Sequence, residues 1–171
     1  MPSSVTVSLK QWLQIEHCPA AWRGFDLYLL RDEQVVFYVG QSHAAFERVW
    51  QHILQGFRGR SALGWFILCN WPASMKFTVE LLRSADILAA HSISADQLEA
   101  ENSLNLAERL LIEHCAPCLN EALNPHPTLL PAVYAPLTAK PICSRSLKKL
   151  IREAARSLDA EARRERAADI W

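Results

Sequence analysis

The chain has 171 residues, of which 50% are hydrophobic and 21% charged, and its formal net charge is zero. This length and balance are typical of one folded domain with a terminal extension, and they exclude a largely disordered chain. The neutral charge gives no overall indication of a polyanionic partner. The charge is unevenly distributed, however, because residues 145–171 carry eight Lys or Arg against five Asp or Glu. The tail is therefore basic and the remainder acidic.

No apolar run is long enough to span a bilayer, and the first residues lack the basic start and apolar stretch of a secretory signal. We therefore expect an intracellular, cytoplasmic protein without a membrane partner. The five cysteines are irregularly spaced in a chain of ordinary domain size, so reduced thiols are expected rather than disulfides.

The first expected element is an N-terminal helix. Ser8 is a candidate helix cap, and Leu9, Trp12 and Leu13 fall on one helical face. The pattern predicts a helix of about ten residues that ends before Pro19.

A hairpin and a helix follow. Residues 25–30 and 35–39 are aromatic and aliphatic runs separated by the polar stretch RDEQ, which predicts two antiparallel strands. In residues 43–54, Phe46, Val49, Trp50 and Ile53 recur at spacings of three and four, which predicts a helix packed on the sheet. A glycine-containing loop comes next, and the apolar run 65–71 fits either a strand or a helix.

The second half begins with a third strand at about residues 76–82, where apolar and polar side chains alternate. Ser94 and Gln97 form a candidate capping box for a long helix that reaches residue 114 and ends before Pro117. Five of the nine prolines lie between Pro125 and Pro141, which predicts an extended surface connector. A basic helix is expected at about residues 144–168.

These elements predict an α/β (α+β) fold with a small, mainly antiparallel three-stranded sheet flanked by helices, an N-terminal helix and a C-terminal helical extension. Residues 1–124 would form the main domain with its core at residues 25–120. Residues 125–143 would form the connector, and residues 144–171 the basic extension.

Polar residues on these elements form a recognisable series. Its positions are Asp26, Leu27 and Tyr28 on the first strand, Tyr38, Val39 and Gly40 on the second, Arg48 and His52 on the following helix, and Glu108, Leu111, Ile112, Pro117 and Asn120 later. Nine residues separate the two tyrosines, and Arg48 follows Gly40 by eight positions. In order and spacing the series resembles the GIY-YIG nuclease superfamily. The departures are Asp26-Leu27 in place of the Gly-Ile of the first motif, and Gln41 where some members have a basic residue.

The resemblance implies a divalent-metal-dependent endonuclease that hydrolyses phosphodiester bonds in DNA. Tyr28 would be the general base, provided that a metal ion, Arg48 or a neutral His52 overcomes its ordinary pKa of about 10. Arg48 would bind the phosphate, and Tyr38 would orient the phosphate or the attacking water. Glu108 would bind Mg²⁺ or Mn²⁺, which a single carboxylate with several waters can hold.

Gly40 and Asn120 complete the implied site. Gly40 would let the backbone approach the substrate, and Asn120 would brace the loop or the surroundings of the metal. Taken singly, each member of the series has an ordinary structural interpretation, such as a core tyrosine or a solvated helix face. A non-catalytic nucleic-acid-binding or structural member of the same fold therefore remains the alternative. The test between the nuclease and this alternative is whether the side chains of the series converge on one open groove.

Basic residues outside the series are candidates for nucleic-acid binding. They are Arg58 and Arg60 in the loop after the first long helix, and Lys148, Arg152 and Arg156 at steps of four in the tail. For the tail stripe, solvation or pairing with the acidic body is as good an interpretation as phosphate binding. The tail helix could equally form a homodimer, which would help one site per chain to cut both strands.

His114, Cys115 and Cys118 form a separate cluster. A zinc site would normally need a second ligand pair, and a thioredoxin-like redox pair belongs after a strand at a helix start. Small thiols packed at the end of the helix are the favoured interpretation, with metal binding left open.

Overall fold

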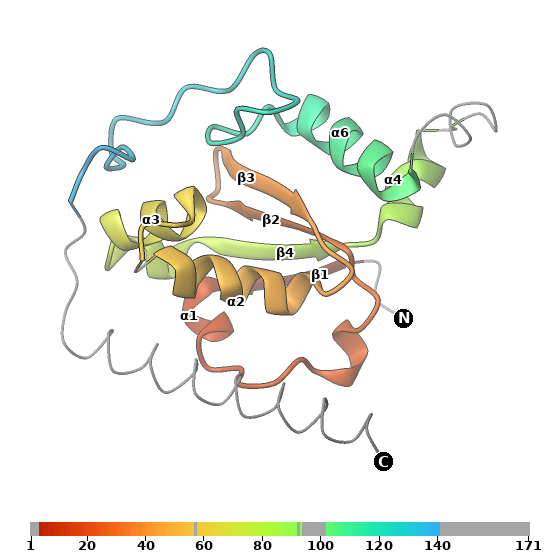
Figure 1. Cartoon of the computed structure of the whole chain (residues 1–171), viewed down its shortest axis with the longest axis horizontal. Helices are drawn as coiled ribbons and strands as arrows, with labels where there is room; N and C mark the ends of the chain where they lie inside the picture. Colours follow the sequence, from red (N-terminus) through yellow and green to blue (C-terminus); the bar gives the residue numbers. More distant parts are fainter. Residues whose placement is uncertain (1–3, 57, 92, 94–101, 141–171) are drawn as a thin grey trace.

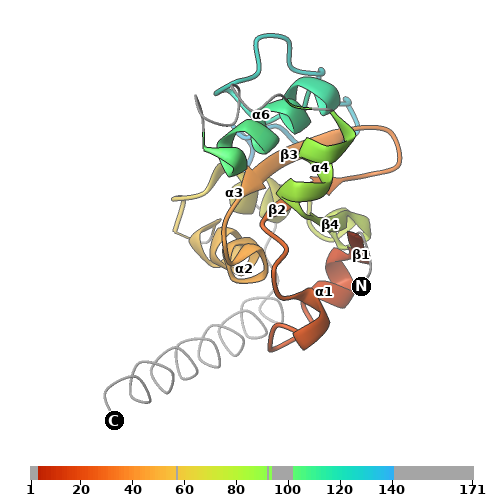
Figure 2. The same cartoon turned by 90° about the vertical axis from the view of Figure 1, so that its right-hand side faces the viewer.

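The computed structural model describes residues 4–56, 58–91, 93 and 102–140. Helices cover both faces of one antiparallel sheet with strand order β1-β4-β2-β3 (Figures 1 and 2). The strands are β1 (Ser4–Ser8), β2 (Leu27–Arg31), β3 (Val36–Gln41) and β4 (Thr78–Leu82). The helices are α1 (Leu9–Trp12), α2 (Ala45–Gly56), α3 (Ala62–Cys69), α4 (Ser84–Ala90) and α6 (Ser103–Cys115), with 3-10 turns at Ala20–Trp22 and Ala73–Lys76.

The prediction of three strands is wrong, because the sheet has four. The additional strand β1 pairs with β4 from Ser4 opposite Leu82 to Ser8 opposite Thr78. The cap at Ser8 is confirmed, since the Gln11 amide donates to the Ser8 hydroxyl at 3.2 Å. The helix that it begins has only four residues, however, instead of about ten. A short strand that leads directly into a helix cap leaves too few residues for its alternation to be recognised.

The hairpin β2–β3, the helix α2 and the strand β4 are confirmed. The ambiguous run after the loop is part of helix α3, and α4 was not predicted. The long helix expected from Ser94 is described only from residue 102 onward, where the Asn102 side chain caps α6. Ser94, Gln97 and the tail residues Lys148, Arg152 and Arg156 lie outside the described residues, as does the whole basic extension.

The two faces of the sheet carry different parts of the core. On β2, Tyr28 and Leu30 face α1, α2 and α3, whereas Leu27 and Leu29 face α4 and α6. An irregularity in the β2–β3 register leaves Phe37 without a cross-strand partner and turns it toward the first face as well. Tyr28 and Tyr38 thus lie on the face that α2 covers.

Helices α2 and α3 are in backbone contact. A Cβ atom on Gly64 would overlap the carbonyl of His52, and one on Gly56 would overlap the backbone of Gly64. The two glycines therefore allow a separation that other residues would prevent. This contact brings the beginning of α3, at Ser61, against His52.

Residues 125–140 contain no helix or strand and are fixed to the core. The Tyr134 ring packs edge-on against Phe37 and Phe77 at centroid distances of 5.0 and 5.4 Å. The Asn70 side chain accepts from the Ala135 amide at 2.7 Å and donates to its carbonyl at 3.1 Å. We call this segment the proline strap. Among the described residues, none of the helices has the length and apolar character needed to cross a bilayer.

Candidate active site

A chain of hydrogen bonds joins β2, α2 and the start of α3. The Tyr28 hydroxyl lies 2.8 Å from Nε2 of His52, and Nδ1 of the same imidazole lies 2.8 Å from Oγ of Ser61. The three residues are 2%, 8% and 8% exposed, respectively. Bonds between buried polar groups are costly to break, so this chain fixes the orientation of the imidazole.

The imidazole of His52 is neutral near neutral pH. Burial lowers its pKa to about 4, and the positive charge of Arg48 acts in the same direction. Ser61 Oγ accepts the Gly64 amide at 3.1 Å, and we assign its own proton to the bond with Nδ1 of His52. With Nδ1 as the acceptor, the imidazole proton resides on Nε2 and is donated to the Tyr28 oxygen.

Tyr28 and Tyr38 stand side by side on the hairpin, with ring centroids 6.2 Å apart. Gly40 is paired with Tyr28 across the two strands. A Cβ atom at Gly40 would lie 2.5 Å from the Tyr28 hydroxyl and 2.9 Å from Cε1 of Tyr38. The glycine therefore makes room for the two tyrosine rings, a more specific role than the expected backbone approach to substrate.

Both tyrosines resist ionisation in the ligand-free protein. Burial raises the pKa of Tyr28 well above its ordinary value, and Tyr38 and Glu108 add to the rise while Arg48 opposes it. Burial also raises the pKa of Tyr38, with Glu108 acting in the same direction, and Arg48 and the Tyr28 hydroxyl oppose it. Arg48, on α2, and Glu108, on α6, thus both act on the tyrosine pair.

Arg48 is an exposed residue on the same helix as His52, and its guanidinium donates to the Gln51 side chain at 3.2 Å. Its effects on Tyr28, Tyr38 and His52 place its charge beside all three groups. An exposed cation next to buried hydroxyls suits a phosphate that approaches from solvent.

Glu108 projects from α6 at the β3 edge of the sheet. The Gln41 side chain at the end of β3 donates to Oε2 of Glu108 at 2.9 Å and to the Asn105 side-chain oxygen at 2.7 Å. Burial raises the pKa of Glu108, and the bonds from Gln41 partly offset that rise. A half-buried carboxylate is costly to keep charged, and a divalent cation would relieve that cost.

The side chains present could hold a magnesium-like ion only through a single protein ligand. Among residues 4–56, 58–91, 93 and 102–140, no three His, Cys, Asp or Glu side chains are grouped closely enough to hold a metal. Mg²⁺ commonly binds through one or two carboxylates and keeps several waters, so Glu108 alone fits as the protein ligand.

Asn120 braces the edge of the sheet. Its side-chain oxygen accepts from the Val39 amide and its nitrogen donates to the Val39 carbonyl, both at 2.9 Å. The backbone amides of Cys118 and Leu119 donate to Val36 and Phe37 just before it. Both amide groups of Asn120 are engaged with the backbone, so of its two expected roles the structure supports bracing.

Asp26, the departure from the first motif, has a structural use. Its carboxylate accepts from the Ser84 amide at 2.7 Å and the Ser84 hydroxyl at 2.6 Å. It thereby caps the first turn of α4 from the residue just before β2. The Asp26 side chain is thus part of the scaffold.

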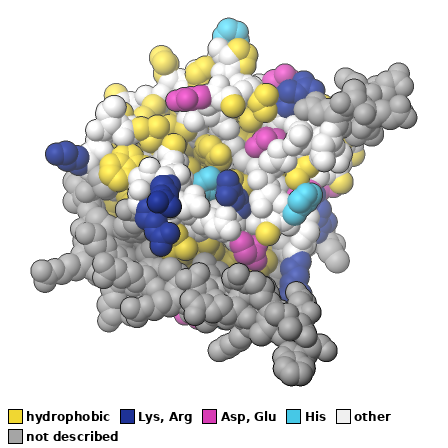
Figure 3. All heavy atoms as spheres, viewed as in Figure 1, with side chains coloured by type: hydrophobic (Ala, Val, Ile, Leu, Met, Phe, Trp, Pro, Cys, Tyr) yellow, Lys and Arg dark blue, Asp and Glu magenta, His cyan; other side chains and the backbone are white. Residues whose placement is uncertain are grey.

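The loop between α2 and α3 presents the expected basic residues to solvent. Arg58 and Arg60 are both exposed. Figure 3 shows Lys and Arg side chains gathered over α2 and this loop, beside a histidine. The open side of the tyrosine pair is therefore bordered by positive charge, which is favourable for a polyanion.

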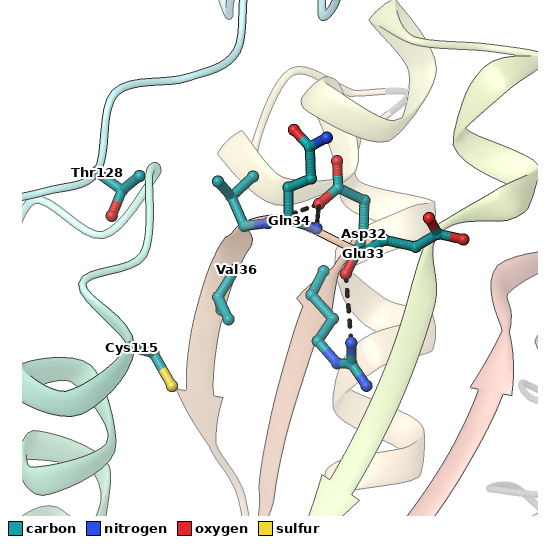
Figure 4. Close-up of a pocket in the computed structure, with 8 residues that line it drawn as sticks. Asp32, Glu33, Gln34, Val36, Cys115 and Thr128 are labelled. Carbon is teal, nitrogen blue, oxygen red and sulfur yellow. Dashed lines mark hydrogen bonds between the residues drawn. The ribbon is translucent and has the colours of Figure 1, made fainter.

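The cysteine cluster does not assemble into one site among the described residues. His114 is exposed, and Cys118 donates weakly to the Leu129 carbonyl at 3.9 Å. Cys115 instead lines a pocket of about 200 Å³ beside the β2–β3 turn, opposite Val36 (Figure 4). Burial raises the pKa of both Cys115 and Cys118, which is typical of packed thiols.

Two residues of the site were not predicted from sequence. Ser61 precedes an apolar run and so carries a helix-cap pattern, but nothing local indicates that its hydroxyl meets His52. Gln41 directly follows Gly40, at a position where some members of the GIY-YIG superfamily have a basic residue, and nothing local predicts its bond to Glu108. The Gln41–Glu108 bond joins residues far apart in the sequence, and the Ser61–His52 bond joins two consecutive helices across the loop between them.

The arrangement offers a cation, two hydroxyls, a neutral imidazole and a carboxylate within one neighbourhood, a set that can bind and activate a phosphoester. Comparison with models of protein families, with curated proteins and with solved structures gave no match.

Proposed function

We propose that the chain is a divalent-metal-dependent endonuclease of the GIY-YIG type, which hydrolyses phosphodiester bonds in DNA. The observation that supports this proposal is the convergence of Tyr28, Tyr38, Arg48, His52 and Glu108, contributed by two strands and two helices on opposite faces of one sheet. Such a set includes a group for each task of phosphodiester hydrolysis, namely water activation, charge relief and leaving-group stabilisation.

Phosphate binding falls to Arg48 and Tyr38. The Arg48 guanidinium is permanently charged and exposed, so a phosphate can reach it directly from solvent. The Tyr38 hydroxyl remains protonated because its pKa is raised, chiefly by burial, and it can therefore donate to a phosphate oxygen or to the attacking water.

Tyr28 is the proposed general base, and its raised pKa must fall when substrate is bound. Two groups favour that fall: the Nε2–H of His52, in the tautomer assigned above, donates to its oxygen, and Arg48 lowers its pKa. Both stabilise a phenolate relative to a phenol. His52 and Ser61 would thus position Tyr28 and support its charge, without touching the reacting atoms.

Glu108 would hold Mg²⁺ or Mn²⁺, with Gln41 fixing the carboxylate. A divalent cation bound there would supply charge neutralisation for the phosphoryl and leaving oxygens. The partner would be DNA, with Arg58 and Arg60 as additional phosphate contacts. A homodimer and the contribution of Lys148, Arg152 and Arg156 remain expectations.

The deciding experiment compares Glu108→Gln with Glu113→Gln, which changes an exposed carboxylate on the same helix. Purified proteins are incubated with plasmid and single-stranded DNA in Mg²⁺, Mn²⁺ or EDTA. Wild type and Glu113→Gln should cleave only with metal, and Glu108→Gln should lose at least about 100-fold in rate, the scale of a lost charge-stabilising group.

Equal metal-dependent cleavage by both variants would remove Glu108 from the site. Metal-independent binding with no cleavage by wild type on any DNA would instead favour the alternative, a non-catalytic nucleic-acid-binding or structural protein.

A further inference from the structure

A second hollow, open to solvent, lies beside Ser61, the residue that is bonded to His52. It has a volume of about 570 Å³ and is lined by Gly59, Arg60, Ser61, Ala62, Trp65 and Leu137. Its walls are the α2–α3 loop, the first turn of α3 and the proline strap. This volume falls within the usual range for small-molecule and cofactor sites.

The hollow is connected to the candidate active site through Ser61. This serine lines the hollow, and its hydroxyl is bonded to His52, which is in turn bonded to Tyr28. Ser61, in the wall of the hollow, is therefore two hydrogen bonds away from the Tyr28 hydroxyl. That placement suits the part of a substrate next to the reacting phosphate.

The lining has the chemistry of a nucleotide site. Arg60 contributes a cation, Trp65 an aromatic ring and Leu137 an apolar side chain, and none of the lining residues is acidic. Bases stack on aromatic side chains, and the adjoining phosphate is met by a basic residue. A purely apolar ligand would leave the Arg60 cation unused, and an anion without a ring would leave the Trp65 ring unused.

The walls are preformed. The Trp65 indole N–H donates to the Leu137 carbonyl at 2.9 Å, which fixes the ring against the strap. The amides of Arg58 and Arg60 both donate to the Gln55 carbonyl at 3.0 Å, and Gly59 between them has a φ of +64°. The loop is therefore a defined turn that holds Arg60 at the rim.

We propose that this hollow binds the base of an unpaired nucleotide that flanks the scissile phosphate, which rests on the nuclease function proposed above. A base stacked within an intact duplex cannot enter such a hollow, because it must first leave the helix. The preferred substrate is therefore DNA that is single-stranded, frayed or branched near the cut.

Binding is measured with the cleavage-impaired Glu108→Gln protein. The probes are a single-stranded oligodeoxynucleotide and an abasic strand with the same number of phosphates. The strand with bases should bind about tenfold more tightly, the scale of stacking one base on an aromatic residue. Its addition should shift the Trp65 indole resonance, identified by its absence in Trp65→Leu.

Matched variants separate base binding from phosphate binding. Arg58→Gln should weaken both strands equally, because Arg58 does not line the hollow. Trp65→Leu should reduce the preference for bases to about threefold or less. Arg60→Gln should weaken both strands while keeping the preference for bases, because Arg60 is assigned to the phosphate; Arg60 is exposed, so its replacement avoids a folding defect.

Equal affinity for the two strands, or no binding of either, would overturn the proposal. So would a full base preference in Trp65→Leu, or saturation by a free deoxynucleoside monophosphate without strand binding. A Trp65-dependent base preference without cleavage by wild type would support the base site while refuting the nuclease. Glu108-dependent cleavage with no base preference would support the nuclease while refuting the base site.

Discussion

Acidification should destabilise the fold through His52. The imidazole is buried between Tyr28 and Ser61, and burial lowers its pKa from 6.5 to about 4. In the unfolded chain the same group takes up a proton near its ordinary value. Between these two values the unfolded state binds more protons, so the free energy of unfolding falls as the pH is lowered.

The size of the effect follows from the two pKa values. From about pH 7 to pH 5 the His52 contribution to unfolding free energy falls by about 2 kcal/mol, and the full loss by pH 4 is about 3 kcal/mol. For a chain of this size, about 2 kcal/mol corresponds to a fall in Tm of roughly 4 to 8 °C.

The assay is chemical denaturation over this pH range for wild type and His52→Gln, which removes the titrating group and keeps a polar side chain. Other groups also titrate in this range; burial raises the pKa of Glu108, for example. The difference in unfolding free energy between the two proteins at each pH therefore isolates the contribution of His52. His43→Gln controls for the loss of an exposed imidazole. Parallel curves for wild type and His52→Gln would refute the buried neutral imidazole, as would an NMR titration of His52 with its midpoint near 6.5.

Two further substitutions test the packing and the hydrogen-bond chain. Gly40→Ala places a methyl group against the Tyr28 hydroxyl, so it should lower the unfolding free energy by about 1 to 3 kcal/mol and remove most of any cleavage activity. A Gly40→Ala protein with wild-type stability and cleavage rate would contradict the geometry. Ser61→Ala removes a helix cap and the partner of His52, so it should cost about 2 to 4 kcal/mol, whereas Ser8→Ala removes a cap alone and should cost about 1 kcal/mol. The ¹⁵N shifts of the imidazole should show the Nε2–H tautomer in wild type and a mixture in Ser61→Ala, and a mixture in both would disprove the donor assignment.

Local periodicity accounts for the parts of the fold that could be predicted. The strands β2, β3 and β4 and the helix α2 each present one apolar face, so their pattern is visible within a few residues. Helix α3 differs because the residues from Phe66 to Cys69 are all buried, between α2 and the proline strap, and a helix that is apolar on every side has no periodic pattern.

The candidate site was predictable as a set of residue types but not as a network. Tyr28, Arg48, His52 and Glu108 stand on elements that the sequence indicates. The bond from Ser61 to His52, by contrast, exists because Gly56 and Gly64 let two helices meet at backbone distance. Such a contact depends on two glycines, which have no side chain, and a sequence motif does not predict it.

The proline strap changes where the functional unit ends. Its Tyr134 hydroxyl donates to the Asp32 carboxylate at 2.5 Å in the β2–β3 turn, and its Leu137 carbonyl holds the Trp65 indole on α3. The strap thereby ties together the hairpin that carries both tyrosines and the helix whose cap positions His52. A boundary at residue 124 would remove these ties while leaving every residue of the candidate site in place. The folded unit therefore extends at least to residue 140. A fragment that stops earlier would lack the bonds that hold the hairpin and helix α3 in place around the candidate site.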